Sequence, residues 1–205
     1  MARPVASENQ VVETRRAILD AAQQLHETDG LGGMSFRAIA AELGCSHSMA
    51  YAYFESKAVL VDNLRIRAYE WMLGELAVAA SSHDRPLDAL RALAAAYVSA
   101  GVRRPRMYEL LYTDQGEMSE TDPALVAVKL AAIGVCQQVI EAGVESGAVV
   151  LAVDPQTAAH LFWVAAHGLV SLEHGGFLVV GRTIDQILPV LFGAVVRGVS
   201  QSEDA

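Results

Sequence analysis

The stretch SFRAIAAELGCSHSMAYAYFESK, residues 35–57, has the pattern of two short helices joined by a tight turn. Gly44 lies where the turn would be, and Ala40 lies where two steeply crossing helices would approach most closely. Ser35 and Ser46 each precede a helical segment and are common N-cap residues. Four small or apolar side chains occupy the positions that would pack between the helices: Ile39, Leu43, Cys45 and Ala50. The stretch therefore predicts a helix-turn-helix.

The rest of the chain also predicts helices. An apolar stripe of Ile18, Ala22 and Leu25 marks a helix from about Val12 to Thr28, with Gly30 at its end. Beyond the helix-turn-helix, we expect helices over about 56–80, 86–102, 105–113, 123–145, 155–173 and 183–199. Four of these begin at prolines that fit a first helical turn (Pro86, Pro105, Pro123 and Pro155), with Asp84, Asp122 and Asp154 as candidate caps. The β-branched run 147–153 is too short and isolated to predict a strand.

These patterns predict an all-α chain of about nine helices. We expect a flexible N-terminal arm (1–10), a three-helix DNA-binding domain (11–56), a C-terminal helical bundle (57–200) and a short tail (201–205). Apolar residues make up 53% of the 205 residues, which is ample for a buried core. The N-terminal ten residues lack the apolar run of a signal peptide, and two cysteines without disulfide or metal spacing fit a reducing cytoplasm. Residues 155–172 lack charged side chains but include His160, His167 and other polar residues, so we expect a buried helix and not a membrane span.

Charge is distributed unevenly along the chain. The net charge is −9, yet residues 1–67 carry seven Lys and Arg against eight Asp and Glu, whereas residues 68–205 carry eight against sixteen. Because affinity for nucleic acid rests on phosphate neutralisation, the second part is a poor partner for DNA, while the first can approach it. The two cysteines, Cys45 and Cys136, lack the spacing of a metal site or a disulfide framework.

The outward face of the second helix of the motif has the composition of a recognition helix. His47 and Ser48 can hydrogen-bond to base edges, and Met49 and Ala52 can meet thymine methyl groups. The residues expected to contact bases and those expected to contact phosphates form a predicted DNA-binding set of nine: Ser35, Arg37, Ser46, His47, Ser48, Met49, Tyr51, Tyr53 and Lys57. Arg37 can reach either a guanine or the backbone.

TRRAILDAAQQLHETDG (14–30), followed by residues 35–57, resembles the DNA-binding domain of the TetR/AcrR family of bacterial transcriptional regulators. The resemblance implies an all-helical homodimer whose C-terminal domain binds a small effector that releases the protein from its operator. The resemblance also implies that five residues at matching positions contact DNA: Arg37, His47, Tyr51, Tyr53 and Lys57. Where the family most often has Gly-Thr-Leu-Tyr, this chain has Ser-Met-Ala-Tyr at residues 48–51, so the operator sequence cannot be transferred from relatives.

Two C-terminal stretches, FWVAAHGLVSLEHG (162–175) and RRPRMYELLY (103–112), resemble the subgroup of the family with a Trp, His-Gly signature. Trp163 and His167 lie four residues apart and combine an apolar wall with a polar group, which suits small-molecule recognition. The candidate effector contacts are Tyr69, Met72, Met107, Leu111, Tyr112, Trp163 and His167, with plain core packing as the alternative for each. His160, His167 and His174 recur every seven residues, a spacing that disfavours a metal site.

The last two predicted helices are too apolar to have one solvent face each, so both must bury two sides. In the family's homodimers the equivalent pair forms a four-helix bundle with its mate, which makes Leu161, Val164, Leu188, Leu191 and Val195 candidate interface residues.

The leading interpretation is a repressor that binds a pseudo-palindromic double-stranded operator as a homodimer and responds to an effector. One alternative is a helix-turn-helix protein without a small-molecule ligand. The other is a metal-dependent helical-bundle enzyme, which the sequence disfavours because no Glu is followed by His at i+3. We therefore expect no catalytic residue, metal or cofactor.

Overall fold

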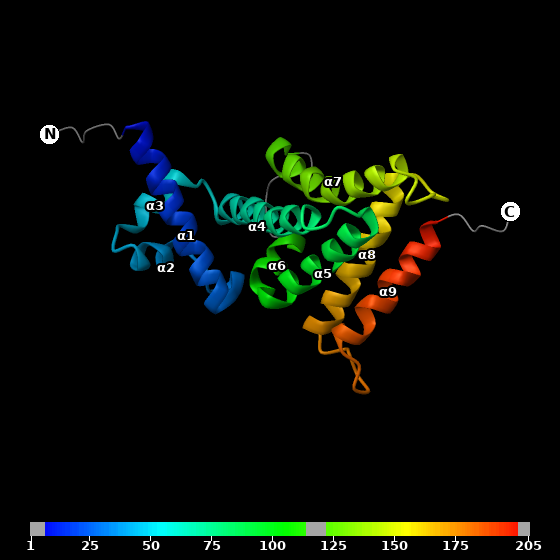
Figure 1. The fold of residues 1–205 in the computed structure, drawn as a ribbon. Coiled ribbons are helices and arrows are strands. Elements are labelled where there is room, and N and C mark those ends of the chain that lie inside the picture. Colours follow the sequence, from blue (N-terminus) through cyan, green and yellow to red (C-terminus); the bar gives the residue numbers. More distant parts are fainter. Residues whose placement is uncertain (1–6, 114–121, 201–205) are drawn as a thin grey trace. The chain divides into compact units, whose positions relative to one another are not determined.

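The structure is a computed structural model that describes residues 7–113 and 122–200. Over these residues the expected all-α fold is confirmed, and the chain forms helices in the expected order (Figure 1). The helices are α1 (Glu8–Gly33), α2 (Phe36–Glu42), α3 (His47–Tyr53), α4 (Lys57–Ala80), α5 (Pro86–Arg103), α6 (Pro105–Tyr112), α7 (Pro123–Glu145), α8 (Pro155–His174) and α9 (Ile184–Val199).

The first helix begins earlier than the periodicity predicts. Ser7 caps α1: its hydroxyl accepts from the Gln10 N–H at 3.3 Å, and the Gln10 side chain accepts from the Ser7 N–H at 2.9 Å. This reciprocal pair is a capping box, and its Ser-x-x-Gln pattern was available in the sequence. The expected arm 1–10 is therefore wrong for its last three residues, which are helical, whereas residues 1–6 lie outside the described part. Gly30, with φ 68° and ψ −175°, is not helical, so the first regular helical segment ends there as expected and a short helical segment continues α1 to Gly33.

Four helices begin at the four prolines that were expected to open them. Asp154 caps α8 through the Thr157 N–H at 2.9 Å, and Asp122 caps α7 through the Ala124 N–H at 2.9 Å. Asp84 does not cap α5: Arg85 takes the N-cap position, and its side chain makes no capping bond among the described residues. The reason is spacing, because a cap must directly precede the first helical residue and Asp84 lies two residues before the proline.

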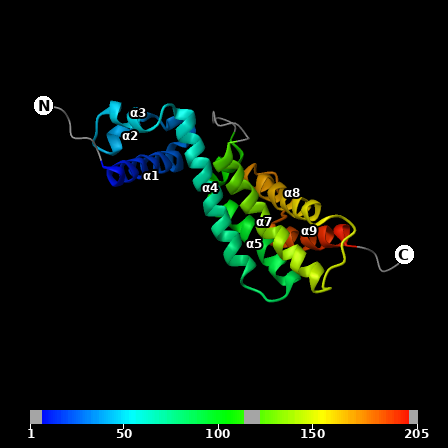
Figure 2. The same cartoon turned by 90° about the horizontal axis from the view of Figure 1, so that it is seen from above.

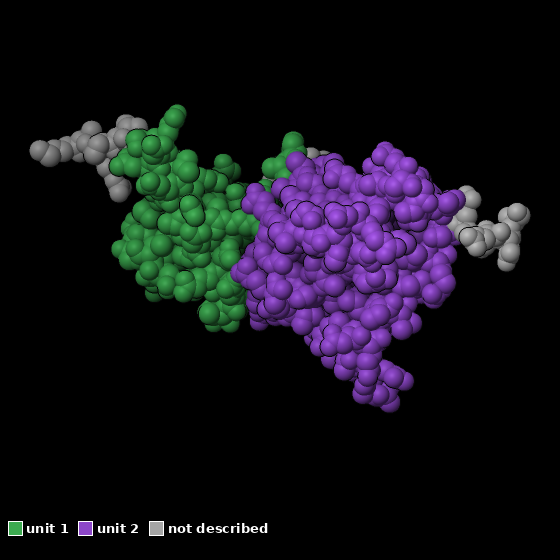
Figure 3. All heavy atoms as spheres, in the orientation of Figure 1, with its two compact units in different colours: residues 1–68, 109–125 green, residues 69–108, 126–205 purple. Residues whose placement is uncertain are grey.

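The chain divides into two compact units (Figure 3): unit 1 is residues 1–68 with 109–125, and unit 2 is residues 69–108 with 126–205. The boundary lies inside α4, after Ala68, and not at the expected 56/57. In unit 1, α1 packs on α2 and α2 on α3 around fully buried side chains such as Ile18, Met34 and Ile39. In unit 2, α8 packs on both α5 and α9, and Figure 2 shows α8 and α9 side by side, with the Phe162 and Phe192 rings 5.6 Å apart.

The run 147–153 forms no described strand, as expected, but it has a structural role. Leu151 makes an isolated antiparallel bridge with Ser200, and the Ala152 N–H donates to the Val199 carbonyl at 2.7 Å. The contact ties the segment before α8 to the end of α9.

One helix among the described residues, α7, is long and apolar enough to cross a membrane by length and composition, with a mean hydropathy of 1.7 over its most apolar window. A single such helix is weak support for a membrane span, because a helix of a soluble protein passes the same test.

Candidate nucleic-acid interface and effector-binding unit

Two of the four predicted packing side chains of the helix-turn-helix are fully buried, and the other two, Leu43 and Cys45, are half-buried. Ile39 and Ala50 are completely buried, and Ala40 is 3% exposed at the crossing of α2 and α3. Gly44 has φ +62°, a left-handed conformation that glycine adopts without a steric penalty. The Cys45 N–H donates to the Ala40 carbonyl at 2.9 Å and closes the turn. The two helices are thereby held at the close crossing that leaves one face of α3 outward.

The outward face of α3 carries polar side chains and one aromatic ring. Ser48 is exposed, Met49 is half-buried and Tyr51 is 49% exposed. The Tyr51 ring packs on Phe36 of α2, with ring centroids 4.2 Å apart, so its direction is fixed by the preceding helix. The Ser46 and Ser48 hydroxyls lie 3.2 Å apart. The His47 side chain lies outside the described part of the structure.

The residues expected at phosphates differ in what they already contact. Arg37 is exposed on α2, and Ser35 caps that helix through the Ala38 N–H at 3.2 Å. Lys57 Nζ donates to the Leu31 carbonyl, and the Tyr53 carbonyl accepts from the Arg15 guanidinium. Sequence reasoning did not select Arg15, because its partner is 38 residues away.

Unit 2 contains a chain of hydrogen bonds between α5, α6 and α8. The Trp163 indole N–H donates to the Tyr97 hydroxyl at 3.2 Å, and the Tyr97 and Tyr108 hydroxyls lie 3.1 Å apart. The Tyr108 hydroxyl is 2.6 Å from His167 Nδ1. Burial lowers the pKa of His167 below its ordinary value, which favours the neutral ring. Trp163 and His167, paired from their spacing, are thus joined through two tyrosines.

The other candidate effector contacts are divided between the two units. Met72 and Met107 are both buried in unit 2, at 2% exposure each. Tyr69, also in unit 2, is half-buried and has Lys129 Nζ 6.0 Å from its ring centroid. Leu111 and Tyr112 belong to unit 1, where Leu111 is buried and Tyr112 is 39% exposed.

The three histidines of α8 each have their own partners. His160 Nδ1 lies 2.8 Å from the Gln156 carbonyl, and its ring is 5.9 Å from that of Trp163. His174 Nε2 lies 3.1 Å from the Gly101 carbonyl of α5. Within residues 7–113 and 122–200, no group of three His, Cys, Asp or Glu side chains could hold a metal ion. The seven-residue repeat is therefore a set of separate contacts along one helix.

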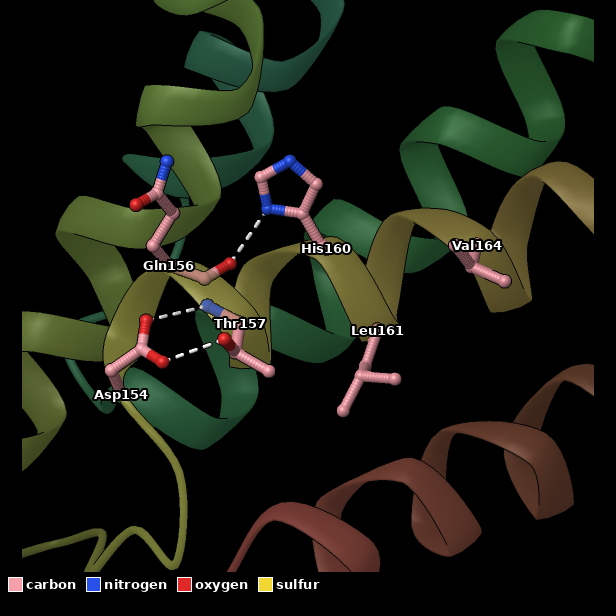
Figure 4. A pocket seen from close by; sticks show the side chains of 6 residues that line it. All are labelled: Asp154, Gln156, Thr157, His160, Leu161 and Val164. Atoms are coloured by element: carbon pink, nitrogen blue, oxygen red, sulfur yellow. Dashed lines mark hydrogen bonds between the residues drawn. The ribbon is translucent and has the colours of Figure 1, made fainter.

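The candidate dimer face includes exposed apolar side chains of α8. Leu161 is 43% exposed and Val164 is 64% exposed, while Leu188, Leu191 and Val195 of α9 are half-buried. A shallow hollow of about 510 Å³ lies at the start of α8 (Figure 4) and is lined by Asp154, Gln156, Thr157, His160, Leu161 and Val164. Hydrogen bonds from the Thr157 side chain and backbone lower the pKa of Asp154. The helix N-terminus is thus already occupied by this carboxylate.

Cys136 of α7 is shielded from water enough that burial raises the pKa of its thiol to about 12. A raised pKa disfavours the thiolate, which is the reactive form of cysteine.

A helix-turn-helix unit followed by a second helical unit is the architecture of a class of all-helical transcriptional regulators. A family model described as "Bacterial regulatory proteins, tetR family" matches residues 18–64, and one described as "Tetracyclin repressor-like, C-terminal domain" matches residues 90–195. The chain belongs to the TetR family. No match was found among the curated proteins.

Solved structures share the fold. A protein of unknown function from Rhodococcus sp. RHA1 is 24% identical, with a TM-score of 0.80 over 91% of this chain and 95% of that one. FadR from Bacillus subtilis in complex with stearoyl-CoA is 13% identical, with a TM-score of 0.71 over 90% and 98%. PfmR from Thermus thermophilus is 18% identical, with a TM-score of 0.65 over 90% and 99%.

Proposed function

We propose that this TetR-family regulator is a cytoplasmic repressor that binds a pseudo-palindromic operator as a homodimer and is released by a small effector. The observation that supports DNA binding best is α3: its packing side is buried against α2, while Ser48 and Tyr51 point outward. A two-fold dimer would place two such helices about 34 to 36 Å apart, one turn of DNA. The proposed DNA contacts remain the nine side chains predicted from the sequence.

The effector proposal rests on unit 2. Trp163, His167 and the buried methionines Met72 and Met107 combine apolar surface with hydrogen-bonding groups. FadR, whose structure contains stearoyl-CoA, supports a small-molecule effector for a chain of this fold. We also assign the C-terminal domain to the Trp, His-Gly subgroup, on the residues that carry that signature. Leu111 and Tyr112 stay predicted contacts.

The homodimer is proposed to form through α8 and α9. Val164 is 64% exposed and Val190 is 69% exposed, which is a large apolar exposure for two consecutive helices of one unit. A second copy that covers these side chains would remove them from water in the symmetric arrangement that most homodimers adopt.

The first test is selection of the purified chain against random duplex DNA, with sequencing of the bound fraction. We expect a palindrome to be enriched. Against that operator, His47→Ala and Tyr51→Ala should each weaken binding by about tenfold or more, the usual value of a base contact.

Two controls separate contact from packing. Tyr51→Phe keeps the ring against Phe36 and removes only the hydroxyl, so it isolates the polar contribution. Val78→Ala changes an exposed side chain of unit 2 and should leave affinity unchanged. Unchanged affinity and sequence preference in both alanine variants of α3 would show that this helix does not recognise the operator.

A further inference from the structure

The recognition helix α3 cannot maintain its own conformation. It has seven residues, and isolated helices of that length are not stable in water. Ser46 occupies its N-cap position but makes no side-chain capping bond among the described residues. The support for α3 must therefore come from its packing side and from its C-terminal end.

The C-terminal end of α3 is held from α1 by one side chain. The Arg15 guanidinium donates through Nη1 to the carbonyl of Tyr53, the last residue of the helix. The same guanidinium lies over the ring of Phe54, 4.3 Å from its centroid. Phe54 is 1% exposed and its N–H donates to the Ala50 carbonyl at 3.2 Å, which closes the final turn.

This arrangement combines three favourable interactions at one point. The hydrogen bond satisfies a carbonyl that lacks an intrahelical partner. The positive charge lies at the negative end of the helix dipole, and the planar guanidinium packs on an aromatic face. Because Phe54 is buried and Arg15 is half-buried on α1, the end of α3 is fixed in position and not only capped.

We propose that Arg15 is a positioning residue for DNA recognition, which fixes the C-terminal end of α3 to α1 and does not itself contact DNA. The inference rests on the proposed DNA-binding function. It predicts that a variant without the guanidinium must order α3 at the moment of binding, so that operator affinity falls although every side chain of the recognition face is retained.

The salt dependence of binding distinguishes a positioning residue from a phosphate contact. A phosphate contact releases counterions, and its loss lowers the slope of log K against log salt by about 0.9 per contact. Two lost contacts in a dimer would lower it by about 1.8. Loss of a positioning residue weakens binding at every salt concentration and leaves the slope unchanged.

The experiment compares Arg15→Met, which keeps the length of the side chain, with Arg16→Met. Arg16 is the matched control because it is adjacent on α1, carries the same charge and is 79% exposed, with Asp20 at 4.0 Å. Arg15→Lys restores a donor for the Tyr53 carbonyl. Operator affinity is measured from 50 to 300 mM KCl, and amide hydrogen exchange is followed over residues 47–54.

We expect Arg15→Met to weaken operator binding by about tenfold to a hundredfold, the effect of losing a charged hydrogen bond. Its salt slope should be that of the wild type, exchange over residues 47–54 should accelerate, and Arg15→Lys should recover much of both. Arg16→Met should match the wild type in affinity and exchange. If Arg15→Met fails to fold, recovery of exchange protection and affinity in Arg15→Lys decides the matter.

Two results would overturn the proposal: equal affinity and exchange in the two methionine variants, or a slope lowered by about 1.8 in Arg15→Met. Failure of the wild-type chain to bind any duplex would instead refute the proposed function. Exchange over residues 47–54 would still report whether Arg15 fixes the end of α3.

Discussion

The Tyr108 hydroxyl lies between two partners of different chemistry, the Tyr97 hydroxyl at 3.1 Å and His167 Nδ1 at 2.6 Å. The indole of Trp163 can only donate, and it donates to the Tyr97 hydroxyl. The tautomer of His167 sets the direction of the bond to Tyr108: with the ring neutral and its proton on Nε2, Nδ1 accepts from the Tyr108 hydroxyl. Burial favours the neutral ring, because it lowers the pKa of His167.

The pH dependence of stability follows from that lowered pKa. The unfolded chain protonates His167 near pH 6.5, whereas the folded chain does so only at lower pH. The contribution of neutral His167 to the free energy of unfolding is therefore complete above pH 6.5. It is lost as the pH falls from 6.5 towards the pKa of His167 in the folded state. We expect the wild type to lose stability relative to His167→Gln between pH 7 and pH 5, measured as urea midpoints.

The control for this prediction is His83→Gln, which changes an exposed histidine between α4 and α5. Its urea midpoint should follow the wild type across the same pH range. A wild-type curve parallel to that of His167→Gln would show that His167 titrates alike in the folded and unfolded states.

At the scale of single elements, α4 contributes residues to two ion pairs that differ in burial and therefore in their contribution to stability. Asp62 and Arg65 lie three residues apart, 3.1 Å between Oδ1 and Nη1, with side chains 0% and 5% exposed. Arg67 pairs instead with Asp20 of α1 at 2.7 Å, where the aspartate side chain is 58% exposed. Removal of one partner from a buried pair leaves an uncompensated charge, whereas an exposed pair is screened by water.

Asp62→Ala should therefore lower the free energy of unfolding by about 3 to 5 kcal/mol, because the buried Arg65 guanidinium would lose the Asp62 carboxylate at 3.1 Å. Asp20→Ala, which breaks the exposed pair in the same unit, should cost less than about 1 kcal/mol. Urea denaturation followed by circular dichroism gives both values. Similar losses in the two variants would contradict the assignment of a buried pair with a structural role.

Helix starts also show what sequence can predict at this scale. The bounds of α2, α3 and the proline-initiated helices followed from caps and prolines within one turn of each start. The start of α1 at Glu8 was missed because the capping box of Ser7 and Gln10 was not recognised. The cap of α5 was placed one residue too early, at Asp84 in place of Arg85. The predicted break at Gly30 is present, because this glycine adopts a left-handed φ of 68°, but a short helical segment follows it to Gly33.

At the scale of the whole molecule, the proposed dimer is tested best on α8. Leu188 and Val195 are half-buried within the protomer, so a charge there would disturb folding as well as association. Val164, 64% exposed, offers a cleaner position. Val164→Glu should weaken dimerisation by about 2 kcal/mol or more, because a carboxylate would be buried between two copies.

Val78→Glu is the matched control, since Val78 is 72% exposed on α4 and lies outside the proposed interface. Sedimentation equilibrium over a range of concentrations measures the dissociation constant of each variant. Two variants that dimerise as tightly as the wild type would exclude the α8 face, and a wild type that is monomeric would exclude the dimer itself.

The sequence by itself determined the helices, their order and the helix-turn-helix, because periodicity, caps, prolines and the Gly44 turn act between residues that are near neighbours in the chain. Only the tertiary structure decided which polar groups meet. Arg15 and Tyr53 are 38 residues apart, and Tyr108 and His167 are 59 apart. Such pairs depend on how whole helices pack, and no local pattern records which face of one helix meets which residue of another. The division of the chain inside α4 has the same origin, since a continuous helix carries no local mark of where its partners change.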